Sequence, residues 1–324
     1  MIELLSENAL ATVQDQGRLG NLRFGVGTSG AMDRLALAAG NLLLGNSASD
    51  AAIELQVFPS HWRFHAEVRF ALTGADTGAR LNRQPLPPWW VARAHRGDEL
   101  QLGRAAHGSR AYLCLPGGID VPLVLGSRST QLRGAFGGLD GRCLRRGDRL
   151  AAARPQSVGC VDIGVVPPGS SMPLGEQGLT TVRVIPASEY ECYESASQLA
   201  FWSREWKITS QSNRYGYRLA GEALVPRAAL EVRSHGIVPG VIQVPPDGQP
   251  IIQMRDAQPT GGYPKFGTVI EADLWRLAQA PIGSRLRFVE TTYDEGVAAL
   301  GANRRWLQDI ERLVGAWAAQ GSWT

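Results

Sequence analysis

Side chains that could do chemistry are concentrated between residues 231 and 265. This segment reads EVRSHGIVPGVIQVPPDGQPIIQMRDAQPTGGYPK and supplies an imidazole, carboxylates, side-chain amides, a phenol and an ammonium group. Binding and catalytic groups tend to lie on loops that a rigid sheet holds in place, so the segment predicts a functional site. Its candidate residues are His235, Gln243, Asp256, Gln258, Tyr263 and Lys265.

Three of these residues fit catalytic roles. Asp256 could take a proton from water, and Lys265 could neutralise negative charge that develops on a carbonyl or phosphoryl oxygen. His235 could titrate near neutral pH. From the residues alone, a solvated lysine is the better interpretation of Lys265, and a structural histidine is as good an interpretation of His235.

Turn residues predict the elements that position these groups. Apolar runs at 238–244 and 250–254 flank Pro-Pro-Asp-Gly at 245–248. Proline fixes φ and glycine supplies a positive φ, so this tetrapeptide predicts a turn between two strands. A second glycine turn is expected at Gly261-Gly262.

A second polar stretch, at 211–218, reads QSNRYGYR. Gln211 and Arg214 are candidates for binding a substrate, because a guanidinium matches the geometry of a carboxylate or phosphate. We prefer Arg214, which lies between a glutamine and a glycine turn, to Arg218. Even so, a solvent-exposed guanidinium is the common alternative for Arg214. The same chemistry makes Arg128 a candidate.

Apolar residues at helical spacing predict a helix over residues 31–44, with Ser29 as its N-cap. Asp33 would lie in the first turn of this helix. A carboxylate there either stabilises the helix electrostatically or takes part in a binding site at the helix terminus. Both interpretations of Asp33 stay open.

Composition bounds the class of protein. The chain has 324 residues, which predicts two domains. Its net charge of +3, without a basic block, gives no reason to expect nucleic acid binding. No apolar run approaches the roughly 20 residues that span a bilayer, and the N-terminus lacks a signal-peptide pattern. With four scattered cysteines that fit reduced thiols, we expect a cytoplasmic protein without a membrane segment.

The 38 glycines and 19 prolines favour many turns and short strands over long helices. A run rich in Pro, Gly and Ser at 154–178 predicts the domain junction. Short helices are expected at 194–202 and 271–279, and a strand at 284–290. Residues 294–320 predict an amphipathic helix, whose apolar stripe suits core packing or association with another protein chain.

Several common catalytic patterns are absent from the sequence. It has neither the G-x-x-x-x-G-K-[ST] phosphate loop nor the G-x-S-x-G elbow of an α/β hydrolase. His61 and His65 lack the glutamate of an H-E-x-x-H pattern, and we predict no metal site. No lysine has the context that biotin attachment requires, so any biotin would come from elsewhere.

Four sequence blocks together are highly specific. The segment already described contains SHG-x-x-PG-x-x-QVPPDGQPI followed by D-x-Q-x-TGGYP, and further blocks lie at 12–33, 74–118 and 211–218. In these blocks the chain closely resembles the family variously called 5-oxoprolinase C subunit, KipA or allophanate hydrolase subunit 2. The resemblance extends from near the N-terminus to about residue 290.

This resemblance implies a mainly β fold with a few helices, arranged as two cyclophilin-like β-barrel domains. We place the N-terminal barrel at 1–175 and the C-terminal barrel, with the C-terminal helix, at 176–324. The implied function is that of the C subunit of an ATP-dependent 5-oxoprolinase, which converts 5-oxo-L-proline to L-glutamate together with an A subunit and a KipI-like B subunit. ATP would be shared with a partner protein, with Mg²⁺ accompanying the nucleotide.

Two other functions exist among relatives of this family. One is the carboxyltransferase component of a biotin-dependent urea or amide carboxylase, and the other is a KipA-type regulator that antagonises a kinase inhibitor. The SHG and QSNR blocks favour the oxoprolinase branch. Pro259, Tyr215 and Thr28 depart from the family pattern, which bears on substrate specificity rather than on the fold.

The residues and the resemblance together give a predicted site without a metal. We predict Lys265, Asp256 and His235 as catalytic residues. The predicted substrate-binding residues are Arg214, Gln211, Gln243, Gln258, Tyr263, Arg128 and Asp33.

Overall fold

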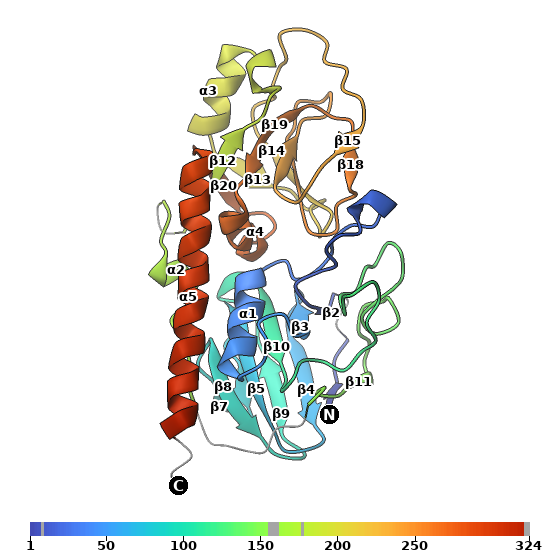
Figure 1. Ribbon diagram of the computed structural model, residues 1–324, viewed down its shortest axis with the longest axis vertical. Coiled ribbons are helices and arrows are strands. Elements are labelled where there is room, and N and C mark those ends of the chain that lie inside the picture. Colours follow the sequence, from blue (N-terminus) through green and yellow to red (C-terminus); the bar gives the residue numbers. More distant parts are fainter. Residues whose placement is uncertain (8–9, 155–161, 176–177, 321–324) are drawn as a thin grey trace. The chain divides into compact units, whose positions relative to one another are not determined.

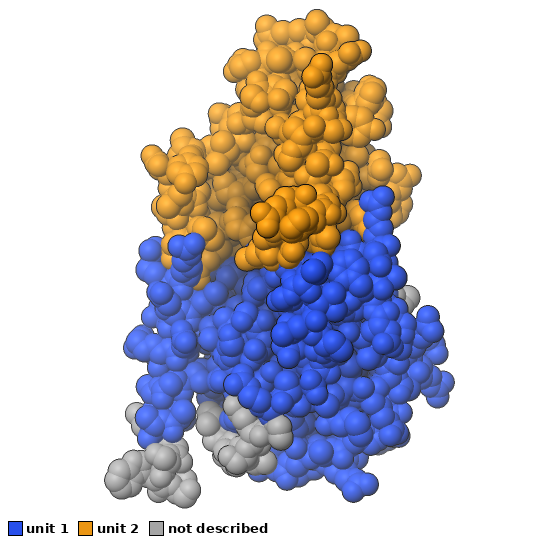
Figure 2. All heavy atoms as spheres, turned by 45° about the vertical axis from the view of Figure 1, so that its right-hand side comes forward, with its two compact units in different colours: residues 1–18, 29–172, 304–324 blue, residues 19–28, 173–303 orange. Residues whose placement is uncertain are grey.

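The computed structural model describes residues 1–7, 10–154, 162–175 and 178–320. The chain is mainly β with a few helices, which confirms the predicted fold class. It divides into two compact units (Figures 1 and 2). Unit 1 comprises Met1–Arg18, Ser29–Met172 and Arg304–Thr324, and unit 2 comprises Leu19–Thr28 and Pro173–Asn303.

These units are not continuous stretches of sequence. The predicted domain boundary, between residues 175 and 176, lies close to the main boundary between the units, which follows Met172. However, residues 19–28 belong to unit 2 and residues 304–324 to unit 1. The predicted junction at 154–178 lies partly outside the described residues, and the predicted domain ranges stay a prediction.

Unit 1 is built from two antiparallel sheets (Figure 1). The first sheet has the order β11-β1-β4-β9-β6-β7, and the second has the order β2-β3-β10-β5-β8. The strands of the first sheet are β1 Ile2–Leu4, β4 Ser60–Phe64, β6 Arg80–Leu81, β7 Gln84–Pro85, β9 Glu99–Leu102 and β11 Arg149–Leu150. Those of the second are β2 Thr12–Gln14, β3 Ala52–Leu55, β5 Val68–Asp76, β8 Trp90–Ala94 and β10 His107–Cys114.

The main core of unit 1 contains residues from both sheets. Trp62 and Phe64 of the first sheet are fully buried in one cluster with Phe70 and Leu113 of the second. Another apolar cluster joins helix α1 (Arg34–Leu43), the second sheet and Ile310 of helix α5 (Tyr293–Gln320). Side chains alternate across a strand, so the second sheet can bury both faces, one in each cluster.

Helix α1 begins later than predicted. It spans Arg34–Leu43, and its N-cap is Asp33, whose Oδ1 accepts a hydrogen bond from Ala36 N at 2.9 Å. The prediction of Ser29 as N-cap is wrong: Ser29 has a φ of 51° and lies outside the helix. Asp33 caps the helix because its carboxylate reaches the unpaired amide three residues on. Its place is thus just before the first turn, rather than within it.

Unit 2 contains a closed barrel in the order β12-β19-β16-β17-β14-β13-β20. A separate two-stranded sheet pairs β15 (His235–Gly236) with β18 (Thr260–Gly261). The barrel strands are β12 Thr180–Pro186, β13 Trp206–Ile208, β14 Gly216–Ala220, β16 Val241–Gln243, β17 Ile251–Gln253, β19 Lys265–Val269 and β20 Arg285–Glu290. The predicted strand, turn and strand around residues 245–248 are confirmed, since β16 pairs antiparallel with β17.

Alternation along three neighbouring barrel strands decides which side chains face away from the barrel core. Tyr217 of β14, Ile242 of β16 and Ile252 of β17 are fully buried, and they pair through the registers Tyr217–Ile252 and Ile242–Ile252. Their neighbours, including Arg218 and Gln253, must therefore point to the outer face of the barrel.

The predicted helices of unit 2 are confirmed within one or two residues. Helix α3 spans Ser195–Ser203, and η3 (Glu271–Asp273) leads into α4 (Leu274–Gln279). The C-terminal helix α5 begins at Tyr293, one residue before the predicted start. No helix in the described part of the chain is both long and apolar enough to cross a membrane. The remaining short helices are η1 Leu22–Phe24, α2 Pro168–Ser171 and η2 Tyr190–Cys192.

Candidate functional site

A polar pocket of about 190 Å³ lies on the outer face of β14, β16 and β17 in unit 2. Four residues predicted from sequence meet in it, although they come from different parts of the chain: Gln211, Gln243, Gln258 and Tyr263. The wall also contains residues that the prediction did not place in the site. These are Asn213, Tyr215, Gly216, Arg218, Ile251 and Gln253.

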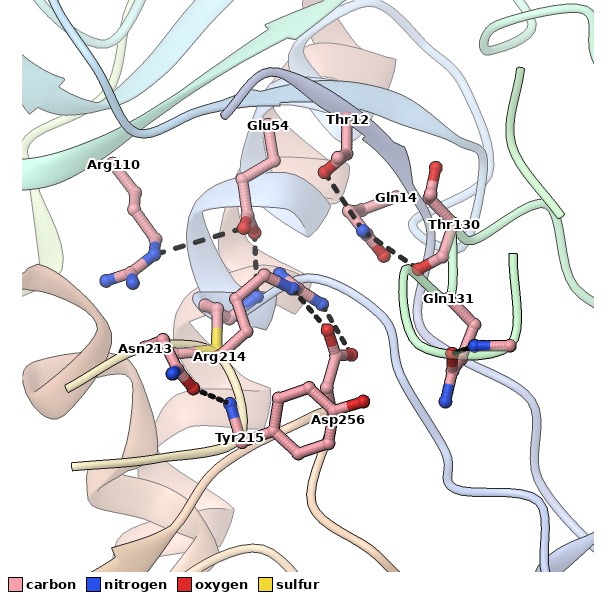
Figure 3. Close-up of polar contacts among 12 residues, drawn as sticks. Thr12, Gln14, Glu54, Arg110, Thr130, Gln131, Asn213, Arg214, Tyr215 and Asp256 are labelled. Atoms are coloured by element: carbon pink, nitrogen blue, oxygen red, sulfur yellow. Dashed lines mark hydrogen bonds and ion pairs between the residues drawn. The ribbon is translucent and has the colours of Figure 1, made fainter. Parts of the chain in front are cut away.

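The segment 211–216 is held in a tight turn at one side of the pocket. Asn213 Oδ1 accepts a hydrogen bond from Tyr215 N at 2.8 Å (Figure 3), and Asn213 N donates to Gly216 O at 3.1 Å. Asparagine forms such turns readily because its side chain can replace a backbone acceptor. This turn leads directly into β14.

Arg214 and Asp256 form a buried, bidentate ion pair beside the pocket (Figure 3). Arg214 Nε lies 2.8 Å from Asp256 Oδ2, and Arg214 Nη2 lies 3.0 Å from Asp256 Oδ1. Their backbones also meet, since Asp256 N donates to Arg214 O at 2.9 Å. Neither residue lines the pocket, so the pair is placed to fix the two loops that carry Asn213 and Gln258.

Two buried amides form the floor between these loops. Gln253 Nε2 donates to Gln243 Oε1 at 3.0 Å, and Gln243 Nε2 donates to Tyr263 O at 3.3 Å. A Cβ atom at Gly261 would lie 2.5 Å from Gln243 Nε2, far closer than two such atoms approach. A side chain at position 261, at the end of β18, would therefore force the amide of Gln243 to move.

Other pocket groups have unused hydrogen-bonding capacity. Within the described residues, the side chains of Gln211, Gln258 and Arg218 make no hydrogen bond or ion pair. Arg218 is exposed, whereas Arg214 is 8% exposed and paired. The geometry thus favours Arg218 over Arg214 as the guanidinium that can receive an anionic group, the reverse of the preference drawn from sequence.

The other two predicted catalytic residues lie on strands near Gly261. Lys265 begins β19, opposite Gln243 of β16, and its backbone N donates to Glu189 Oε2 at 3.3 Å. Its ammonium group has no partner among the described residues. His235 faces Gly261 across the β15–β18 pair, and its Nδ1 lies 2.9 Å from Arg233 O. A carbonyl can only accept, so neutral His235 carries its proton on Nδ1.

An apolar groove of about 620 Å³ adjoins the pocket, and Tyr263 lines both. Its walls include Leu224, Val244 and Tyr193. Burial, reinforced by the charge of Glu189, raises the pKa of Tyr193 to about 12. Its phenol is therefore neutral at physiological pH and contributes no charge to the groove.

The remaining predicted site residues belong to unit 1, and neither lines the pocket. Asp33 is fully buried and caps helix α1. Arg128 donates through Nε to Val121 O at 2.9 Å, and its backbone N donates to Asp15 Oδ2 at 2.6 Å. Both residues thus have structural partners inside unit 1, and their predicted role in substrate binding stays a prediction.

Asp15 is the centre of a second polar cluster that the site prediction did not include. Its Oδ1 accepts hydrogen bonds from Gly17 N at 2.8 Å and from the hydroxyls of Ser127 and Ser129. With Arg128 N on Oδ2, four donors surround one carboxylate that is 8% exposed. A carboxylate has about four lone-pair positions, so its hydrogen-bonding capacity is used within the protein.

One sequence pattern could have identified two of the missed pocket residues. Strands β14 and β17 alternate buried and outward positions, and Arg218 and Gln253 are polar residues at outward positions. The pattern is weak because each strand is short, with five and three residues. Within the described residues, no group of three or more His, Cys, Asp or Glu side chains could hold a metal ion.

Comparison with known proteins places the chain in a family. The family model described as the carboxyltransferase domain, subdomain A and B, matches residues 24–290. The chain is also 41% identical to the 5-oxoprolinase C subunit from Haemophilus influenzae over 314 residues, which cover 97% of this chain and 99% of that protein. The chain belongs to this carboxyltransferase-domain family. The resemblance expected from the four sequence blocks is confirmed.

Other carboxyltransferase-domain proteins extend the comparison. The 5-oxoprolinase C subunit from Escherichia coli is 41% identical over 96% of this chain and 97% of its own length. Among solved structures, the K. lactis urea amidolyase superposes with a TM-score of 0.86 at 29% identity. That match covers 96% of this chain but only 20% of the urea amidolyase chain. The fold is therefore shared with one part of a much longer protein.

Proposed function

We propose that the chain is the C subunit of an ATP-dependent 5-oxoprolinase, which opens 5-oxo-L-proline to L-glutamate. The observation that carries this proposal is the 41% identity to a 5-oxoprolinase C subunit over nearly the full length of both proteins. The partners proposed are the A subunit and the KipI-like B subunit of that enzyme, and the proposed location is the cytoplasm.

The chemistry explains the requirement for ATP. An amide carbon is a poor electrophile, and phosphorylation of the amide oxygen would make it a better target for water. The net reaction consumes two water molecules: one supplies the new carboxyl oxygen and the proton on nitrogen as the ring C–N bond breaks, and the other balances the conversion of ATP to ADP and free phosphate. Lys265 is the residue we propose to stabilise negative charge on the reacting oxygen, because its ammonium is unpaired within the described residues.

The pocket of unit 2 suits a small, polar cyclic amide. Its volume of about 190 Å³ is below the roughly 300–1,000 Å³ that is typical of sites for larger ligands. Amide side chains line it, and Arg218 can pair with the carboxylate of 5-oxoproline. The sequence lacks a phosphate loop, so we propose that the partner proteins supply most contacts to ATP and its Mg²⁺.

The decisive experiment reconstitutes the complex. Purified chain, the authentic A and B subunits, 5-oxoproline and ATP should together release glutamate and phosphate. Omission of this chain is the control and should abolish both products. If the complete mixture releases neither product, the proposed function is wrong.

A second function is favoured by the structural match to urea amidolyase. In it the chain would transfer a carboxyl group from carboxybiotin to urea or another amide, and biotin would come from a partner protein. The discriminating assay supplies a biotin carboxylase with its biotin carrier, bicarbonate, ATP and urea. Carboxylation of urea that depends on this chain, without glutamate release in the first assay, would establish this alternative.

A further inference from the structure

The orientations of two buried amides in the pocket are set by a backbone carbonyl. Gln243 Nε2 lies 3.3 Å from Tyr263 O. The oxygen and nitrogen of a side-chain amide are assigned from their hydrogen-bond partners, and a carbonyl can only accept a hydrogen bond. Gln243 must therefore direct its NH₂ group toward Tyr263, and its oxygen toward Gln253.

This constraint passes on to Gln253. Because Gln243 presents an oxygen, Gln253 must donate with Nε2, and the observed distance is 3.0 Å. The Oε1 atom of Gln253 is then left as an acceptor. Among the described residues nothing donates to it.

A ligand in the pocket would cover this open acceptor. Gln253 is 6% exposed and Gln243 is 2% exposed, and both line the pocket. The Oε1 atom of Gln253 itself stays accessible to solvent. A ligand that displaces water from it must donate a hydrogen bond in return, because covering the oxygen without a donor costs free energy. The pocket therefore selects for a ligand with an N–H group at this position.

We propose that Gln253 determines the specificity of this pocket by accepting a hydrogen bond from the N–H group of a lactam, and that Gln243 is the positioning residue. The proposal rests on the proposed function and names the part of 5-oxoproline that is recognised. Arg218, in the same pocket, would pair with the carboxylate of the ligand. A lactone, in which an ester oxygen replaces the N–H group, would place two acceptors against each other and should bind weakly.

The test measures binding to the full-length chain without its partners. Calorimetry or ligand-detected NMR would compare 5-oxoproline with the lactone 5-oxotetrahydrofuran-2-carboxylate, which differs only in the ring N–H. An unmatched buried polar group changes affinity roughly 10- to 100-fold, so the wild-type chain should prefer the lactam by that factor. Equal affinity for the two rings, or no binding of either, would overturn the proposal.

Two variants separate recognition from general damage to the pocket. Gln253→Leu removes the acceptor and should reduce the preference for lactam over lactone to about one. Gln243→Leu leaves Gln253 free to rotate its amide, so the same ratio should fall while the lactone binds as well as before or better. A purely structural role would weaken both ligands alike. Retention of the full preference in Gln253→Leu would contradict the proposal.

The exposed Gln101→Leu substitution on β9 of unit 1 is the matched control, and thermal unfolding checks that each variant is folded. Turnover in the reconstituted complex is a separate measurement. A chain that discriminates lactam from lactone but supports no glutamate release would leave the recognition intact and refute the proposed function. Glutamate release, together with an unchanged preference of Gln253→Leu for lactam over lactone, would support the proposed function and refute recognition by Gln253.

Discussion

The Asp15 cluster of unit 1 and the amide pocket of unit 2 are both rich in polar groups, but they differ in how those groups are satisfied. Asp15 accepts four hydrogen bonds from its own unit. The pocket contains an exposed guanidinium, Arg218, without a partner among the described residues. Saturated polar groups hold a fold in place, whereas unsatisfied groups around a cavity can bind a ligand.

The Arg214–Asp256 pair gives the sharpest test of this distinction, because it is saturated and yet lies beside the pocket. Asp256→Ala would leave a buried guanidinium unpaired and should lower the free energy of unfolding by roughly 3–5 kcal/mol. Urea unfolding monitored by fluorescence would measure it. The double variant Arg214→Leu/Asp256→Leu should recover most of the stability, because two apolar groups can replace a buried ion pair.

Turnover of that double variant then decides the role of Asp256. If Asp256 positions the loops, recovery of stability should bring partial recovery of turnover in the reconstituted complex. If Asp256 is the general base predicted from sequence, turnover should stay absent even in a stable protein.

Lys265 should show the opposite behaviour, since its ammonium is open rather than saturated. Lys265→Ala is expected to lower turnover by roughly 10²–10³, the effect of losing one electrostatic stabiliser, with little change in unfolding. Lys265→Arg should also be impaired, because a guanidinium is not a compact point charge. Lys207→Ala, an exposed position on β13, is the control. Near-normal turnover in both Lys265 variants would mean that the residue is merely solvated.

Asp15 should affect stability more than function of the pocket. Asp15→Ala removes the acceptor of several buried donors, and the expected loss is roughly 3 kcal/mol in the free energy of unfolding. Gln211→Ala, an open and exposed pocket residue, should change stability by less than about 0.5 kcal/mol. Chemical denaturation of both variants would measure the two free energies of unfolding. Equal losses would contradict the distinction between the two regions.

A smaller effect is expected from pH at another saturated carboxylate of unit 1. Hydrogen bonds from Arg142 hold the pKa of Asp148 below its ordinary value of 3.8. The folded state therefore gains stability above that value and loses it as the pH falls through the lower folded pKa. The unfolding free energy of the wild type should fall more steeply from neutral to acid pH than that of Asp148→Asn. The exposed Asp120→Asn substitution should retain the wild-type slope.

Much of the local structure was accessible from the sequence because it depends on neighbouring residues. Proline and glycine at 245–248 predicted the β16–β17 hairpin, and apolar spacing predicted helix α5 to within one residue. The choice of Ser29 as N-cap failed, because the chain has Ser29 and Asp33 at two possible starts and the local pattern did not rank them. Only the carboxylate of Asp33 reaches Ala36 N.

The sequence by itself determined which chemical groups were available: amides, a phenol, guanidinium groups and an ammonium within two short segments. Tertiary structure decided their partners. Arg214 is paired because the fold brings it to Asp256, 42 positions along the chain, whereas Arg218 is a cation of the pocket wall without a partner among the described residues. By contrast, Gln243 and Gln253 are joined through the β16–β17 hairpin, whose register the turn between the strands sets. The partnership of Arg214 with Asp256 joins segments far apart in the chain, and no local pattern of residues specifies it.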